Sequence, residues 1–96
     1  MSDPEVTVEQ NTERHRFEAL VEGKVAGFIT YRSTDDEVEL QHTVVKPDYE
    51  GRGVGSLLVR TTLEQIQEAG KKVIPSCPFV RAYLDRHPEW DSLRAS

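Results

Sequence analysis

The sequence predicts a single α/β domain of the α+β kind, in which helices pack on a mixed, mostly antiparallel sheet. Three observations lead to this class. Strand-like segments come first, in a run of three joined by short turns between Arg14 and Val45. Helical segments then alternate with one more strand, so the element order is β-β-β-α-β-α. The length of 96 residues is that of one domain and leaves no room for two.

The start of the chain is polar and has no clear periodicity. We expect residues 1–13 to form a flexible segment or a short edge strand at Val6 to Glu9, before a domain that spans residues 14–96. The first ten residues lack the basic and apolar regions of a secretory signal, which makes a cytoplasmic protein the expectation.

The first two strands of the domain form a predicted hairpin. Phe17, Ala19 and Val21 alternate with their neighbours at the period of a half-buried strand. Gly23 then turns this strand directly into the next, which runs from Val25 to Tyr31.

A third strand is predicted from Val38 to Val45, after a polar turn. Regular alternation along it defines two faces. One face carries Val38, Leu40, His42 and Val44, and the other carries Glu39, Gln41, Thr43 and Val45.

Two helices and a short strand complete the domain. The apolar spacing predicts a helix from about Val54 to Ala69, which Gly70 ends. A short buried strand includes Val73 and Ile74. Cys77 as N-cap and Pro78 at the first helical position then open a second helix, which ends at His87-Pro88.

Composition limits the function classes. The formal net charge is -5 and the pI is about 5.1, which argues against nucleic-acid binding through bulk charge. No window has the run of about 18 apolar residues that a membrane span needs. A single cysteine forms no internal disulfide, and no His, Cys or acidic residues have metal-ligand spacing, so we expect no metal.

The segment from Gly51 to Gly55 places three glycines at alternate positions between a strand and a helix. The first amides of a helix lack intrahelical acceptors and its dipole adds positive potential, so a pyrophosphate fits there. The segment is no Walker A loop, because no Lys precedes Ser56, and its spacing differs from the dinucleotide fingerprint. A glycine turn without a ligand remains the alternative.

The stretch from Val44 to Leu58 resembles the acetyl-CoA motif of the GNAT superfamily of N-acetyltransferases, which has Arg or Gln, two residues, Gly, any residue, and Gly or Ala after a strand. The stretch from Val73 to Trp90 is similar to the minimal, YjdJ-type subfamily. Together the resemblance covers the chain from about Arg16 to Trp90. Glu50 departs from the motif, since the superfamily favours Arg or Gln there.

The resemblance implies a coenzyme site for acetyl-CoA. The strand would offer backbone groups to the pantetheine arm, the glycine turn would hold the pyrophosphate, and the strands around Val44 and Ile74 would splay apart. The residues assigned to this site are Val44, Val45, Gly51, Arg52, Gly53, Val54, Gly55, Ser56 and Pro78.

Three side chains are candidates for the chemistry. Cys77, at a helix N-terminus, is the expected nucleophile or proton donor for the departing thiolate, and a buried small residue is the alternative. His42 is a candidate general base, with a core histidine as the alternative. Tyr83 is a candidate general acid by analogy with the superfamily, although an aromatic core residue is the better interpretation.

These residues predict an acetyl-CoA-dependent N-acetyltransferase that transfers an acetyl group to an amine. An amine on a protein or peptide is one of the acceptors considered. The resemblance implies that larger members of the superfamily carry one or two helices between their first two strands, which shape the acceptor site. Here Gly23 turns one strand directly into the next. The acceptor site should therefore be open. A non-catalytic CoA-binding module is the alternative, and a purely structural domain is the third hypothesis.

Overall fold

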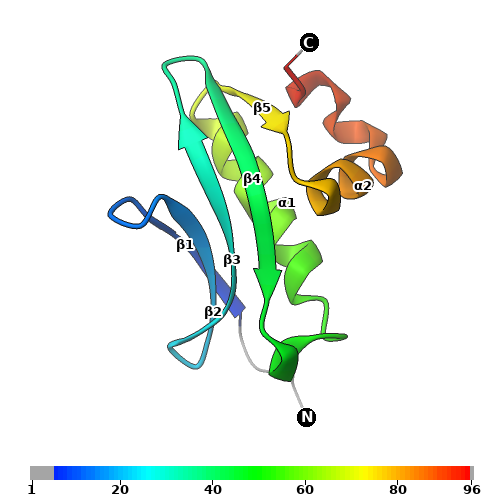
Figure 1. Cartoon of the computed structure of the whole chain (residues 1–96). Helices are drawn as coiled ribbons and strands as arrows, with labels where there is room; N and C mark the ends of the chain where they lie inside the picture. Colours follow the sequence, from blue (N-terminus) through cyan, green and yellow to red (C-terminus); the bar gives the residue numbers. More distant parts are fainter. Residues whose placement is uncertain (1–5, 96) are drawn as a thin grey trace.

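Five strands form one sheet in the computed structural model, which describes residues 6–95. The antiparallel strands are β1 (Val6–Asn11), β2 (Arg16–Val21), β3 (Lys24–Ser33) and β4 (Glu37–Val45). Strand β5 (Lys72–Pro75) pairs parallel with β4, and the spatial order follows the chain. The predicted mixed sheet is confirmed (Figure 1).

The edge strand predicted at the start of the chain is a full strand, β1, which pairs with β2 from Val6 to Asn11. Residues 1–5 of the predicted N-terminal segment lie outside the described part of the chain. Because β1 precedes β2, the connection between the first two strands is the turn of residues 12–15 and not Gly23, which joins β2 to β3. Both connections are tight turns.

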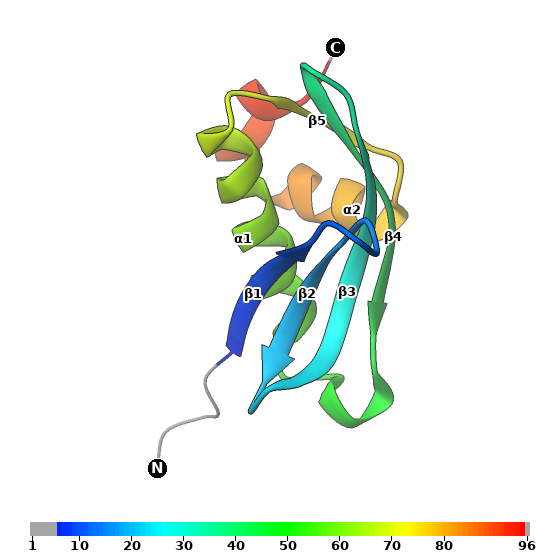
Figure 2. The same cartoon turned by 90° about the vertical axis from the view of Figure 1, so that its left-hand side faces the viewer.

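Both helices pack on the same face of the sheet, α1 (Val54–Glu68) and α2 (Pro78–Arg86) (Figure 2). Two short 3-10 helices, Pro47–Tyr49 and Pro88–Leu93, precede α1 and follow α2. The core between sheet and helices contains fully buried Ile29, Leu40, Leu58, Leu63, Ile66 and Leu84. Among residues 6–95, none of the helices has the length and hydropathy needed to cross a bilayer.

A bulge in β4 changes which side chains face the helices. Thr30 pairs with His42 but Tyr31 pairs with Leu40, so Gln41 is an extra residue. Up to Leu40 the even residues face the core, and beyond the bulge the odd residues do. The predicted faces are therefore wrong: Val38 and Leu40 share the helix side with Thr43 and Val45, whereas His42 and Val44 are exposed on the other side. Regular alternation fails because one extra residue reverses the side-chain direction.

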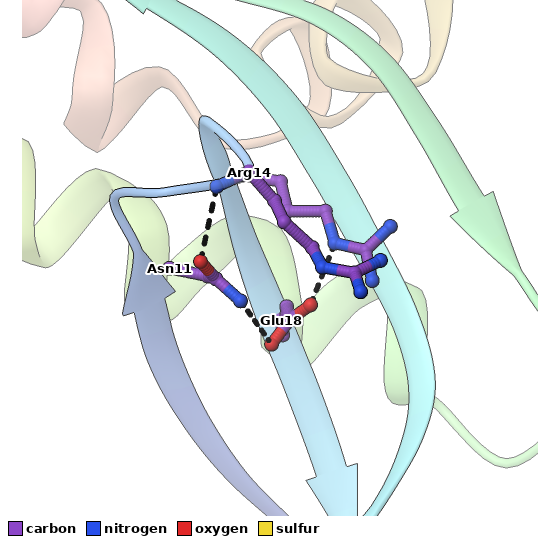
Figure 3. A network of polar contacts seen from close by, with 4 residues as sticks. Asn11, Arg14 and Glu18 are labelled. Carbon is purple, nitrogen blue, oxygen red and sulfur yellow. Dashed lines mark hydrogen bonds and ion pairs between the residues drawn. The ribbon is translucent and has the colours of Figure 1, made fainter.

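The sheet face opposite the helices, called here the uncovered face, carries a polar network near the turn of residues 12–15 (Figure 3). Glu18, which is 9% exposed, accepts a hydrogen bond from Arg16 Nε at 2.6 Å and one from Asn11 Nδ2 at 3.4 Å. The Arg16 guanidinium also lies 4.3 Å above the Phe28 ring. Asn11 Oδ1 accepts a hydrogen bond from the Arg14 backbone amide. The network ties β1 to β2 and β3 where the chain turns.

Strands β3 and β4 approach closely at Gly27. A Cβ at this position would lie 2.7 Å from the Val44 carbonyl oxygen and 3.3 Å from the Val45 Cα, both parts of the β4 backbone. Neither atom can move without moving the strand. Glycine is therefore required here by the spacing of the two strands.

We expect Gly27→Ala to lower the free energy of unfolding by about 1–3 kcal/mol, because β4 must shift to admit the methyl group. Urea denaturation followed by circular dichroism measures the change. Lys24→Ala, at an exposed position of the same strand, is the control and should alter stability little. Equal stability of Gly27→Ala and wild type would contradict the close approach.

Candidate functional site

Strand β4 and the chain that follows β5 diverge at the end of their pairing, and this divergence is called here the fork. Their pairing ends at Leu40 and Pro75, after which the chain leaves the sheet toward α2 (Figure 1). Two hydrogen bonds hold the base of the fork: the Cys77 amide donates to the Leu40 carbonyl at 2.9 Å, and Ser76 Oγ donates to Glu39 Oε2 at 2.6 Å. The predicted splaying around Val44 and Ile74 is found only in part: Ile74 still pairs with Glu39, and beyond Leu40 only β4 continues as a strand, toward Val44.

A hollow of about 360 Å³ lies between the open arm of β4 and the start of α1. Thr43 and Val45 contribute from β4, and Phe79 contributes from α2. The remaining wall is the glycine turn with the beginning of α1, namely Tyr49, Glu50, Gly51, Gly53, Val54, Gly55 and Ser56. The hollow therefore joins the fork to the N-terminus of the longer helix.

The N-terminus of α1 offers backbone donors to this hollow. The first intrahelical bond runs from the Leu57 amide to the Gly53 carbonyl at 3.0 Å, so the amides of Val54, Gly55 and Ser56 precede it. Among residues 6–95, no side chain caps this end. Such amides, together with the positive end of the helix dipole, form an anion site that suits the phosphates of a ligand.

Glycine is required at the three positions of the turn for two different physical reasons. Gly51 and Gly53 have φ values of +79° and +76°, and the space that a Cβ would enter is open, so backbone conformation alone demands glycine there. Gly55 has an ordinary φ, but its Cβ would lie 2.8 Å from Phe79 Cζ. Its small size lets α2 pack against the start of α1.

Two charged residues of the turn lie on different sides. Glu50, the departure from the family motif, lines the hollow at the start of α1. Arg52 does not: it lines a second, larger hollow on the β1 and β2 side, and its guanidinium lies 5.9 Å from the Tyr49 ring. The uncapped amides expected at the start of α1 are present, and the predicted contacts of these amides and of Arg52 with phosphates stay predictions.

Cys77 lies at the fork beside Thr43. It is the N-cap residue of α2 as predicted, is only 3% exposed, and its Sγ lies 3.2 Å from Thr43 Oγ1. Burial raises the pKa of the thiol. Hydrogen bonds from the Thr43 hydroxyl and from the backbone at Val80, Phe79 and Thr43 outweigh burial, so the Cys77 pKa is lowered from its ordinary value.

His42 is not brought together with Cys77. The bulge places His42 on the uncovered face, where its side chain is exposed, while Cys77 lies on the helix side. Val44 shares the side of His42, and its carbonyl oxygen points toward Gly27 of β3 rather than into the fork. Thr43, which the sequence did not single out, takes the place beside the thiol. No local sequence signal marks the bulge that puts it there.

Tyr83 belongs to the packing between α2 and its surroundings. Its ring stacks on His87 with centroids 4.0 Å apart, and the residue is 4% exposed. Burial raises the pKa of the phenol, with opposing smaller effects from Arg60 and Glu89. These surroundings are those of a core aromatic residue, and a catalytic role for Tyr83 stays a prediction.

Comparisons with known proteins agree with this geometry. A family model described as GCN5-related N-acetyl-transferase matches residues 16–93. Protein NATD1 of Mus musculus is 27% identical over 85 residues, which cover 86% of this chain and 77% of the mouse protein.

Two solved structures are also similar. A GCN5-like candidate N-acetyltransferase from Staphylococcus aureus, determined by NMR, has a TM-score of 0.70 and 28% identity, covering 100% of this chain and 92% of its own. The ribosomal-protein-S18-alanine N-acetyltransferase of Escherichia coli has a TM-score of 0.64 at 24% identity, covering 80% of this chain and 54% of its own. The latter likeness shows the shared fold.

We expect alkylation of Cys77 by iodoacetamide to begin at lower pH than that of an ordinary thiol, because the lowered pKa enlarges the thiolate fraction at a given pH. The rate will be slow, since the side chain is almost buried. Mass spectrometry over a pH series measures it. In Thr43→Val, which keeps the side-chain shape without the hydroxyl, the profile should move to higher pH. Identical profiles would show that Thr43 does not tune the thiol.

Proposed function

The chain belongs to the GCN5-related N-acetyltransferase family, and from this premise we propose that acetyl-CoA is its acetyl donor and an amine on a protein or peptide is its acceptor. The observation that carries the proposal is the fork between β4 and β5. It joins an uncapped helix N-terminus, which suits a pyrophosphate, to a thiol with a lowered pKa.

The residues of the first hollow fit CoA. The amides of Val54, Gly55 and Ser56 provide donors for the pyrophosphate, and no side chain of the described part of the chain caps them. Thr43 and Val45 line the way from these amides to the fork. Successive residues of a strand point their backbone groups to opposite sides, so Thr43 and Val45 direct theirs toward the fork and can pair with the pantetheine amides.

Acetyl transfer requires a balanced exchange of bonds and protons. The amine nitrogen bonds to the thioester carbonyl carbon, the carbon–sulfur bond breaks, and its electron pair stays on the CoA sulfur. The amine loses a proton and the sulfur gains one. Cys77, with its readily released proton, is the donor to the CoA sulfur, and the Thr43 hydroxyl stabilises the thiolate left behind.

The base acts on the other side of the sheet. His42 is exposed on the uncovered face, so it can accept a proton from an amine that approaches the fork from that face. With the base on one side and Cys77 on the other, direct transfer through the fork is the arrangement that these positions favour. Transfer through an acetylated Cys77 is the alternative route that uses the same sulfur.

The uncovered face favours a protein-borne amine. Only the tight turn of residues 12–15 joins β1 to β2, so among the described residues no helix lies over this face (Figure 2). A small amine would have few contacts on this open face. An amine carried by a protein would be held by contacts that the rest of that protein makes. The similar E. coli protein acts on an alanine of a ribosomal protein, which accords with such an acceptor.

The same openness supports a second candidate function, a non-catalytic CoA-binding module. Such a module would keep the amide cradle and the first hollow but would have no acceptor of its own. The two candidates agree on CoA binding and differ only in turnover.

Saturating CoA should stabilise the protein, because a ligand that binds only the folded state adds about 2.7 kcal/mol at a concentration 100 times its Kd. Thermal unfolding with and without CoA measures this. Acetyl transfer is then assayed with free amines, N-terminal peptides and lysine peptides, through release of free thiol. Absence of any stabilisation would rule out both candidates, and binding without transfer to any acceptor would leave the module.

Cys77→Ala should lower acetyl transfer by about 100-fold, the size of a lost general acid, while CoA affinity changes little. Cys77→Ser is the matched control for shape and should be almost as slow, since a hydroxyl releases its proton poorly. Intact mass after incubation with acetyl-CoA alone separates the routes. We expect no acetyl adduct, and a stable adduct that disappears on adding the amine would establish the alternative route.

A further inference from the structure

The two edges of the sheet differ in how their outer sides are covered. Strand β5 is four residues long and ends at Pro75, and on its outer side the Val73 carbonyl accepts a hydrogen bond from the Ala95 amide at 2.8 Å. Strand β1, the edge strand at the other end of the sheet (Figure 2), has six residues and no Pro or Lys. Among residues 6–95, no backbone hydrogen bond reaches its outer side. Strand β1 therefore presents free backbone donors and acceptors to another strand.

Strand β1 is also regular and apolar on its helix side. Its six residues pair one for one with β2, without the bulge by which many natural edge strands prevent further pairing. On the helix side, Val6 and Val8 are half-buried against the core. The apolar surface continues from Val6 into the larger hollow, whose wall includes Val21, Val54 and Leu57. A strand added to this edge would therefore cover apolar surface as well as backbone groups.

The side chains of β1 favour one way of pairing with a second β1. In an antiparallel pair, opposed residues lie on the same side of the sheet, so two registers use five of the six residues, with either Val8 or Glu9 opposite itself. The Glu9 register opposes two like charges, which is destabilising. The Val8 register joins the two valines on the helix side. On the uncovered face it places Thr7 of each copy opposite Glu9 of the other, so no two charges oppose each other.

We propose that β1 is the dimerisation edge of this protein and pairs antiparallel with β1 of a second copy, with Val8 on the two-fold axis. Two five-stranded sheets then become one continuous sheet with all helices on the same side. The fork lies between β4 and β5, at the other end of each sheet, so both forks stay open and the inference does not depend on the proposed function. One strand pair covers less than the about 1,200 Å² of a stable interface, so we expect a reversible dimer with a Kd of about 0.1 mM.

Two substitutions of opposite charge at Thr7 test the register. Sedimentation equilibrium of wild type at about 10 μM to about 1 mM protein should show monomer and dimer in exchange. Thr7 is exposed, so both variants should fold. Thr7→Lys places an ammonium opposite Glu9 at two symmetric points and should tighten the dimer about fivefold, whereas Thr7→Glu should weaken it about fivefold. Salt at about 0.15 M screens charges beyond about 8 Å, so contacts dominate over net charge.

Matched controls separate the contact from net charge. Ala82→Lys and Ala82→Glu change the net charge by the same amounts at an exposed position of α2, which packs beside β4 and β5, and should dimerise as wild type does. In the Thr7→Lys background, Glu9→Gln should remove the gain in affinity, because the ammonium loses its partner. Thermal unfolding of each variant, followed by circular dichroism, verifies that it is folded.

Hydrogen exchange locates the interface independently. Amides of β1 should exchange more slowly at the higher protein concentration, while those of β5 should not change. Four results would overturn the proposal: a wild type that is still monomeric at about 1 mM, Thr7 variants that do not shift the equilibrium in opposite directions, Ala82 variants that shift it as much, or a dimer whose β1 amides gain no protection. The last three would place the contact on another surface. Acetyl-CoA binding and transfer are unaffected by any of them.

Discussion

One extra residue in β4, Gln41, is the constraint on which the candidate site depends. It reverses the alternation of the strand, so Thr43 meets Cys77 on the helix side while His42 lies on the uncovered face. A regular strand would direct Thr43 away from the thiol. The bulge also coincides with the end of β4–β5 pairing, where the fork begins. A single insertion thus sets both the opening and the groups that line it.

The glycine turn is the second organising feature, and its parts differ in purpose. Positive φ at Gly51 and Gly53 directs the chain into α1, while the absence of a side chain at Gly55 lets Phe79 pack against the helix start. The turn therefore exposes backbone donors and also closes one wall of the first hollow. Glu50 lines the first hollow, whereas Arg52 lines the larger hollow on the β1 and β2 side.

The small size of the domain concentrates function near the core. Cys77 is buried among core residues, and Thr43 is only partly buried beside it, so the hydrogen bond that tunes the thiol is also a tertiary contact between β4 and α2. On the uncovered face, Glu18 and Arg16 form a partly buried pair that takes no part in the fork. Its position indicates a structural role, because losing one partner would leave a charge poorly solvated.

By itself the sequence determined the elements and the family. Periodicity and the turn residues Gly23, Gly70 and Pro88 marked the strands and helices, since these signals act over a few residues. The motif from Val44 to Leu58 indicated the family. Only the tertiary structure decided the rest. The bulge, the Thr43–Cys77 contact and the side taken by Arg52 depend on pairing between segments far apart in the chain, which no local pattern encodes.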